Sequence, residues 1–413
     1  MKRKTGLLRD IGALLAVVGL LTGRPSVVAA ATFVFAVWLL SDRAGRRALQ
    51  RMVTTQTLSP AAVRVNQVAD LAVSVTNASA WPIPLLEWSG QLPQGIEVMA
   101  REGSLITISE GRKPAVHGRY SMRRWEEVIQ HVLVRSNRRG RYVFGPTYLE
   151  VRDPLGFADV DKSEASEAIL TVFPALCEVP SALTMPTAPY GTRRGLPWSP
   201  PDPTRYVGIR PYEPGDSPRL IHPFASARTG TLQVKRLETE ADDEVELVAL
   251  ASTAPYLWEG VDPLKLESLI VAAASTAYHY IHQGAAVGFS LAGSVYGQPH
   301  GFAVKPENSK DQWARIQTAL AWVTPGGGTA GDLTAILGRL ASRSRPGTRI
   351  CVFTCFFARD WIPYVERLRR RGLRVTWVAV GGDTEFPALP GVSIVHWTPE
   401  SLKLQTSEAN TSV

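Results

Sequence analysis

Two apolar runs open the chain, and both are short. Residues 11–21 read IGALLAVVGLL and residues 26–40 read SVVAAATFVFAVWLL, with TGRP between them. A helix needs about 20 apolar residues to cross a bilayer core, although flanking arginines that snorkel can close a gap of this size. We predict a transmembrane hairpin at residues 1–51. A cleaved signal peptide, a single apolar anchor and a re-entrant hairpin are the alternatives.

Short runs of alternating apolar and polar residues follow the two apolar runs. They cover residues 61–65, 71–75, 105–109, 128–134, 142–151 and 168–173, with turn residues between them. Strands of this length, each bounded by a turn, are typical of an antiparallel β-sandwich, which we place at residues 52–178. Trp81, Trp88 and Trp125 are expected to be core or edge aromatics of this sandwich rather than a ligand platform.

The pattern changes again in the second half of the chain. Residues 180–203 are rich in Pro, Gly and Ser, so we assign residues 179–240 to a connector and signature region. Apolar runs then alternate with helical patterns over residues 241–400, which predicts a mainly parallel sheet covered on both faces. Ligands of such sheets bind beyond the carboxyl ends of the strands. Residues 401–413 form a polar tail.

Charge is distributed unevenly along the chain. The 413 residues include 45 Lys and Arg and 37 Asp and Glu, a formal net charge of +8. Residues 1–51 alone hold nine basic and two acidic residues, so the remainder is nearly neutral, which argues against a nucleic acid as partner. Only Arg24 lies between the two apolar runs, so the positive-inside rule places both termini in the cytoplasm. The predicted localisation is the cell membrane, with the soluble domains facing the cytoplasm.

The three cysteines indicate a reducing compartment. Cys177, Cys351 and Cys355 cannot form an even set of disulfides. Cys351 and Cys355 lie in an apolar run with no His or Cys cluster beside it, so core packing is favoured over metal ligation.

The stretch from Tyr206 to Gly230, YVGIRPYEPGDSPRLIHPFASARTG, combines a tight turn with clustered charges. Pro214 and Gly215 favour a type II turn, because Pro presets φ at the first corner and Gly accepts a positive φ at the second. The charged and polar side chains around this turn predict a hydrogen-bonded ion network of Arg210, Asp216, Arg219, His222 and Arg228.

This stretch resembles the signature of the domain of unknown function 58 (DUF58) family, which reads roughly G-x-R-x-Y-x-P-G-D-x-x-R-x-I-[DH]-W-x-x-[ST]-A-R. Pro223 replaces the usual Trp. The R-G-x-Y pattern at residues 139–142 and the D-P-x-G pattern at residues 153–156 also resemble the family. The positions that match the signature are Gly208, Arg210, Tyr212, Pro214, Gly215, Asp216, Arg219, Ile221, His222, Ser226, Ala227 and Arg228.

The resemblance implies that residues 241–400 form a von Willebrand A-like α/β domain. Full versions of that domain bind Mg²⁺ through an Asp-x-Ser-x-Ser motif, a Thr and a further Asp. Here the first strand ends in LASTA at residues 250–254 and a later strand ends in VFTC at residues 352–355, with no Asp in either. Hard divalent cations need carboxylate ligands, so we expect that the metal site is lost and that no cofactor binds.

Two further readings concern possible chemistry. The loop from Gly326 to Thr329 suggests a phosphate-binding loop, but it lacks the Gly-Lys-Ser/Thr ending, so a capped helix start is favoured. A hydrolase would have to use Asp216 and His222 without a Ser or Cys nucleophile at a recognisable spacing.

The sequence therefore predicts a membrane-anchored, non-enzymatic interaction or scaffold protein. The partner is expected at the carboxyl edge of the α/β sheet. The resemblance adds a MoxR-type AAA+ ATPase and a transglutaminase-like membrane protein as partners, in assembly or envelope processes. A metal-dependent ligand-binding von Willebrand A-like protein and a hydrolase are the alternatives. The residues of the predicted partner-binding edge are Ser252, Thr253, Gly327, Gly328 and Thr329.

Overall fold

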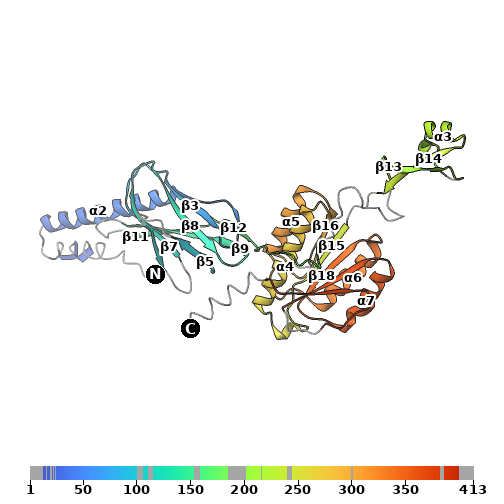
Figure 1. Ribbon diagram of the computed structural model, residues 1–413. Coiled ribbons are helices and arrows are strands. Elements are labelled where there is room, and N and C mark those ends of the chain that lie inside the picture. The colour runs from blue at the N-terminus through green and yellow to red at the C-terminus, as the bar shows by residue number, and fades with distance from the viewer. Residues whose placement is uncertain are drawn as a thin grey trace. The chain divides into compact units, whose positions relative to one another are not determined.

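The computed structural model of the chain divides into two compact units, residues 1–174 and residues 175–413 (Figure 1). The predicted polar tail and residues 185–200 of the connector lie outside the residues that the structure describes. The described residues are 13–14, 16–18, 21, 23, 25–99, 106–109, 115–152, 159–184, 201–214, 216–239, 244–298, 301–381 and 386–399.

The second apolar run forms helix α2, Pro25–Gln50. Its apolar part ends at Leu40, after which Asp42 and three arginines enter the helix, and Ala48 and Leu49 near its end are buried in the core of the first unit. Within the described part of the chain, no helix is long and apolar enough to cross a membrane. The predicted transmembrane hairpin was therefore wrong.

Residues 11, 12, 15, 19 and 20 of the first apolar run lie outside the described residues. The cell-membrane localisation and the cytoplasmic orientation remain predictions.

The rest of the first unit consists of sandwich-like sheets, as the alternating runs predict. Their orders are β1-β3-β8-β5, β11-β10-β4-β7-β6 and β2-β12-β9, and every neighbouring pair is antiparallel except β2 with β12. The strands are β1 (Met52–Ser59), β2 (Ala62–Arg64), β3 (Val68–Asn77), β4 (Ile83–Gln91), β5 (Ile96–Met99), β6 (Ile106–Ser109), β7 (Ala115–Met122), β8 (Glu127–Ser136), β9 (Gly140–Phe144), β10 (Thr147–Arg152), β11 (Asp159–Glu164) and β12 (Ala168–Phe173).

Two details of this unit refine the predictions. The run at residues 142–151 forms two strands, β9 and β10, because Pro146 lies between them and has no N–H to give to a ladder. Trp88 is a core residue, as expected, whereas Trp81 and Trp125 are exposed. A Cβ at Gly118 would lie 1.9 Å from Nε1 of Trp88, so the buried ring packs directly on the backbone of β7.

The second unit contains the predicted mainly parallel sheet. Its order is β17-β16-β15-β18-β19-β20, with β17 as an antiparallel edge strand. Helices cover both faces, because β15 is buried at every residue after Glu244 and therefore needs cover on both sides. The elements are β15 (Glu244–Leu250), α4 (Pro263–His282), β16 (Ala286–Ala292), β17 (Phe302–Glu307), α5 (Lys310–Ala321), α6 (Ala330–Arg343), β18 (Arg349–Thr354), α7 (Ile362–Arg370), β19 (Arg374–Val380) and β20 (Ser393–Trp397), with 3-10 turns at Leu257–Glu259 and Arg359–Trp361.

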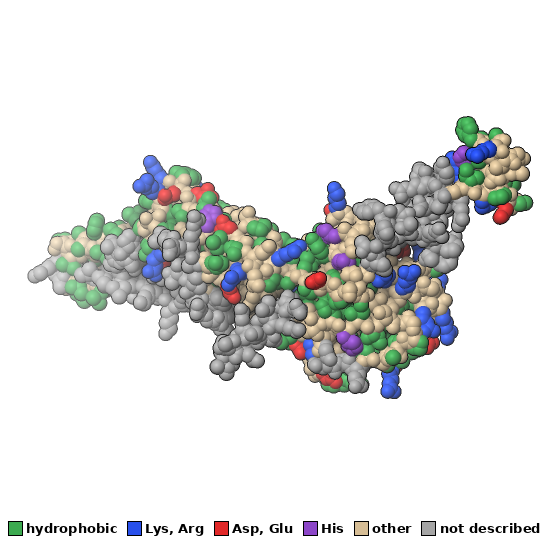
Figure 2. Space-filling view, viewed as in Figure 1, with side chains coloured by type: hydrophobic (Ala, Val, Ile, Leu, Met, Phe, Trp, Pro, Cys, Tyr) green, Lys and Arg blue, Asp and Glu red, His purple; other side chains and the backbone are tan. Residues whose placement is uncertain are grey.

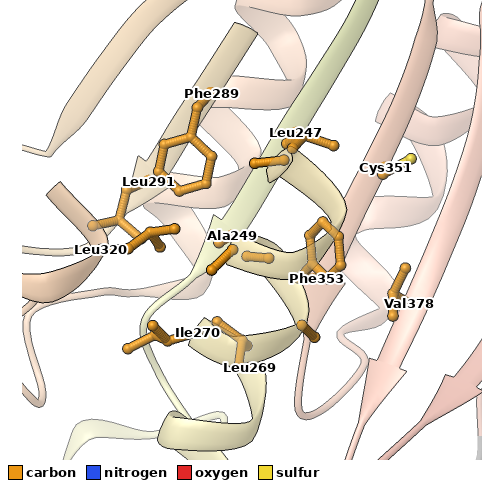
Figure 3. Close-up of a cluster of buried hydrophobic side chains, with 14 of the residues drawn as sticks. Leu247, Ala249, Leu269, Ile270, Phe289, Leu291, Leu320, Cys351, Phe353 and Val378 are labelled. Carbon is orange, nitrogen blue, oxygen red and sulfur yellow. The ribbon is translucent and has the colours of Figure 1, made fainter. Parts of the chain in front are cut away.

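Each face of the sheet has its own hydrophobic core. Leu247, Phe289 and Phe353 of the sheet pack with Leu269 and Ile270 of α4 on one face (Figure 3). On the other face, the sheet packs on α6 and α7 through residues that include Val248, Ile336, Leu337 and Leu368. Alternate residues of β15 therefore contribute to opposite cores, which is the period of a strand buried on both sides.

The signature stretch forms a small module within the second unit. Strands β13 (Pro201–Pro211) and β14 (Gln233–Thr239) pair antiparallel, and between them lie a 3-10 turn (Pro218–Leu220) and the short helix α3 (Pro223–Thr229). We call residues 208–235 the signature module.

Candidate functional site

Three loops meet beyond the carboxyl ends of β15 and β16. They cover residues 251–262, 293–298 and 322–329. Ser294 accepts the backbone N–H of Thr324 (3.0 Å), and Trp322 accepts that of Tyr296 (3.0 Å). A Cβ at Gly326 would lie 3.7 Å from Val261, so the first loop contacts the third. These loops form the carboxyl edge at which the sequence predicts a binding site.

The first two predicted edge residues hold the loop that follows β15. The hydroxyl of Ser252, which is 5% exposed, donates to the carbonyl of Ala254 (2.9 Å). The hydroxyl of Thr253 accepts the backbone N–H of Asp262 (2.8 Å), and Asp262 caps α4 by accepting from Leu264 (2.9 Å). Both hydroxyls therefore make hydrogen bonds within the chain and fix the shape of the loop.

The glycine pair of the third loop packs against the end of β16. A Cβ at Gly327 would lie 2.2 Å from the Ser294 hydroxyl, and a Cβ at Gly328 would lie 2.3 Å from the Ala292 carbonyl oxygen. The third loop therefore approaches β16 as closely as only glycine permits. Gly328 is buried and Gly327 half-buried.

Thr329 begins α6 with a capping box, in agreement with the helix-cap reading of this loop. Its hydroxyl accepts the backbone N–H of Asp332 (3.2 Å), and the Asp332 carboxylate accepts the backbone N–H of Thr329 (2.9 Å). The structure thus brings the five predicted edge residues to one edge, where they shape the loops.

Exposed aromatic rings lie beside these loop residues, and the sequence reasoning missed them. Trp258 is 81% exposed and Tyr256 is 53% exposed. Their rings are stacked, with 4.4 Å between the ring centres and an angle of 10° between the ring planes. Tyr296, in the loop after β16, is 54% exposed. Its ring lies edge-on to that of Trp322, with 6.2 Å between the ring centres. The available signal was PYLW at residues 255–258, an apolar run in a loop where polar residues are usual.

The chemical groups at the strand ends that a von Willebrand A-like metal site would use are neutral. β15 is followed by Ala251, and β18 by Cys355, whose burial raises the pKa of its thiol to about 12. Cys351 is also buried, so both cysteines pack in the core as predicted. In the part of the chain that the structure describes, no group of three or more His, Cys, Asp or Glu residues could hold a metal ion.

In the signature module, Arg210 and Asp216 form a two-pronged ion pair. Nη1 of Arg210 donates to Oδ2 (2.7 Å) and Nη2 donates to Oδ1 (2.6 Å). Asp216 also accepts the backbone N–H of Glu213 (2.9 Å), which closes the predicted turn. The hydrogen-bonded Arg210 guanidinium is the main cause that lowers the pKa of the Asp216 carboxyl, and the hydrogen bond from the Glu213 backbone lowers this pKa further.

The structure places the other predicted network residues outside this ion pair. Nδ1 of His222 caps α3 by accepting the backbone N–H of Ala225 (3.2 Å). Arg219 and Arg228 are exposed, with no carboxylate partner among the described residues, and Gly215 lies outside those residues. Tyr212 contributes a backbone N–H to Leu232 (2.9 Å), and a Cβ at Gly208 would meet nothing within 4 Å.

The departure from the family signature has a local explanation. Pro223 is the first residue of α3, where a missing N–H costs no hydrogen bond and the fixed φ suits a helix. Phe224, the next residue, is 84% exposed.

Residues 208–408 match the model of a family described as "Protein of unknown function DUF58". The match covers the signature module and the α/β sheet and supports the DUF58 resemblance. A search of curated proteins found no match.

Several solved structures resemble parts of the chain. A CARDB domain from Pyrococcus furiosus, solved with di-metal ions, is 16% identical over 29% of this chain and 91% of its own, with a TM-score of 0.20. A non-cellulosomal cohesin from Archaeoglobus fulgidus is 18% identical over 29% of this chain and 90% of its own, with a TM-score of 0.20. The major pilin SpaD from Corynebacterium diphtheriae is 10% identical over 29% of this chain and 34% of its own, with a TM-score of 0.23.

Proposed function

We propose that this chain, in which residues 208–408 match DUF58, is a non-enzymatic interaction protein that binds a protein partner at the carboxyl edge of its α/β sheet. The observation that carries the proposal is the exposed, stacked pair of Tyr256 and Trp258 at that edge. Trp and Tyr are the residues on which protein interfaces most often concentrate their binding energy.

Burial of the Tyr256 and Trp258 rings against a partner would be favourable in free energy. An aromatic side chain buries about 150–250 Å². At about 25 cal/mol per Å² that burial contributes roughly 4–6 kcal/mol, before the costs of association are subtracted. The loop that carries the rings is already fixed by Thr253 and Asp262, so little conformational entropy is lost when a partner binds.

The groups that a hydrolase would need are engaged in structural contacts, which supports the non-enzymatic part of the proposal. Both carboxylate oxygens of Asp216 accept hydrogen bonds from Arg210, and Nδ1 of His222 accepts one from Ala225. A nucleophile or general base needs a free lone pair directed at a substrate.

The family resemblance supports the finer part of the proposal. It suggests that the α/β unit is a von Willebrand A-like domain that has lost its metal ligands. It also suggests a MoxR-type AAA+ ATPase as the partner, together with a transglutaminase-like membrane protein, in assembly or envelope processes.

The experiment measures binding of the full chain to the MoxR-type ATPase of the same organism and identifies co-purifying proteins by mass spectrometry. Trp258→Ala should abolish the complex without changing the melting temperature, because the ring is exposed. Trp81→Ala, which removes an exposed Trp of the first unit, is the matched control. A complex that survives Trp258→Ala contradicts the proposal, and loss of binding in both variants would mean that the edge is not specific.

A further inference from the structure

The stacked rings at the carboxyl edge leave one face of an indole open. The rings of Tyr256 and Trp258 lie nearly parallel, so Tyr256 covers one face of the indole, and because Trp258 is so exposed, the opposite face meets solvent. The face of an aromatic ring carries the negative end of its quadrupole and attracts a cation, and an indole does so more strongly than the rings of Tyr and Phe. The ring offered to a partner is therefore apolar but favours a positive charge.

An exposed carboxylate belongs to the same turn as this ring. Leu257–Glu259 is a 3-10 turn, in which Glu259 donates its backbone N–H to the Tyr256 carbonyl (3.2 Å). Glu259 is exposed, and no Lys, Arg or His pairs with it in the part of the chain that the structure describes. Asp262 follows three residues later, is also exposed, and uses one carboxylate oxygen to cap α4. The carboxylate next to the open ring is therefore available to an incoming cation.

The loops of the carboxyl edge differ in charge from the chain as a whole. The three loops that meet there hold Glu259 and Asp262 and no Lys, Arg or His, whereas the whole chain carries a net charge of +8. The first turns of α4 and α6 add Lys265 and Asp332, and the loop after β18 adds one base and one acid, so the edge keeps a net charge of −2. Figure 2 shows acidic side chains among hydrophobic ones at the lower end of the α/β domain, where the yellow segment that leads into α4 lies in Figure 1. This charge attracts cationic partners and repels anionic ones.

The inference rests on the proposed function and names the chemistry of the partner. We propose that the segment that docks at the carboxyl edge is basic and places an arginine on the open face of Trp258. A guanidinium is planar and weakly hydrated, so it stacks on an indole while its N–H groups donate sideways to a carboxylate. Glu259 supplies that carboxylate. An acidic segment or an anionic lipid surface is a poorer fit, because Glu259 and Asp262 repel it.

The test titrates the full chain into fluorescent peptides in which Ser alternates with Arg, Lys, Gln or Glu, and follows anisotropy at low and physiological salt. The Arg peptide should bind saturably and more tightly than the Lys peptide, because a compact ammonium cannot stack as a guanidinium does. The Gln and Glu peptides should bind more weakly than both on the order of tenfold or more, because they offer no cation. Binding of the Arg peptide should weaken as salt screens the charges.

Two substitutions separate the ring from the charge. Trp258→Leu keeps an apolar side chain but removes the ring, and it should weaken binding of the Arg peptide by about three- to thirtyfold. Glu259→Lys reverses a charge at the contact and should weaken binding on the order of tenfold. Trp81→Leu and Glu178→Lys are the matched controls, because they change an exposed Trp and an exposed Glu outside these loops, and both should bind as the wild type does. All four variants should melt near the wild-type temperature, since the side chains are exposed.

Several results would overturn the proposal. They are equal losses in Glu178→Lys and Glu259→Lys, a Trp258→Leu variant that binds as the wild type does, and a Gln peptide, a Glu peptide or phosphatidylglycerol vesicles bound as tightly as the Arg peptide. Self-association of the chain that Trp258→Ala abolishes would also overturn it, because a second copy would then cover the edge.

The complex with the natural partner separates this proposal from the proposed function. A complex that both Trp258→Ala and Glu259→Lys abolish supports the two together. A complex that Trp258→Ala abolishes but Glu259→Lys leaves intact keeps the carboxyl edge as the partner site and overturns the basic segment. A complex that neither substitution weakens overturns both.

Discussion

The signature module and the α/β sheet are both covered by the DUF58 match, yet they are held together in different ways. The sheet buries apolar side chains in two cores, one on each face. In the module, Val234 is buried at 1% exposure, whereas Phe224, Ile209 and Leu232 are exposed and the chief polar contact is the Arg210–Asp216 pair. The density of a sequence motif is therefore a poor guide to where a domain draws its stability, because hydrophobic burial supplies most of it.

The largest effect should come from the sheet core. Phe353→Ala removes a fully buried ring and should lower the free energy of unfolding by about 3–5 kcal/mol, through lost burial and a cavity. Chemical denaturation measures this loss. Phe224→Ala in the signature module is the matched control and should change stability by about 0.5 kcal/mol or less, because that ring is exposed. Similar losses in both variants would remove the distinction between the two regions.

A smaller loss is expected at the glycine loop of the carboxyl edge. Gly328→Ala should cost about 1–3 kcal/mol, because the new Cβ lies 2.3 Å from a carbonyl oxygen of β16 and the loop must shift. Gly208→Ala in the module meets nothing within 4 Å and should be close to neutral. Bulky substitutions at Gly328 are consequently unsuitable probes of partner binding, since they disturb the fold. A Gly328→Ala protein as stable as the wild type would contradict this packing.

The ion pair of the module should have a local effect that depends on pH. The folded-state pKa of Asp216 is lowered, so the pair stabilises the module above the unfolded-state pKa, and this contribution is lost as pH falls through the folded-state pKa. The Asp216 carboxylate accepts the backbone N–H of Glu213. In Asp216→Asn at neutral pH, this amide should therefore be less protected from hydrogen exchange, while the melting temperature of the sheet is unchanged. Unaltered protection of that amide would show that the pair does not hold the turn.

The smallest effect is expected from divalent metal. Ser252 and Thr329 make hydrogen bonds within the chain, and the carboxyl ends of β15 and β18 carry no carboxylate. Mg²⁺ and Mn²⁺ should therefore give no saturable heat in calorimetry and no thermal shift beyond an ionic effect. Saturable micromolar binding would instead favour the metal-dependent ligand-binding alternative.

The local structure of this chain could be predicted from sequence, because its signals act between near neighbours. The alternation of apolar runs with helical patterns predicted the parallel sheet, and the loop from Gly326 to Thr329 indicated a capped helix start, which is the start of α6. The turn at residues 213–216 followed from Pro and Gly in the same way, since Asp216 donates its backbone N–H to Glu213 (3.0 Å).

Only the tertiary structure decided which side chains meet, because that depends on how separate loops pack. It paired Asp216 with Arg210 alone of the three signature arginines, used His222 as a helix cap, and directed Tyr256 and Trp258 outward as a stacked pair. It also joined the turns before β18 and β19, so that Arg349 and Arg374 are register neighbours although they are distant in sequence. The apolar run at residues 26–40 was predicted to be half of a membrane hairpin. In the structure it belongs to α2, whose last third is polar and whose end is buried in the core of the first unit. Periodicity records the environment of each residue along one element, whereas the meeting of two elements is determined by packing across the whole domain.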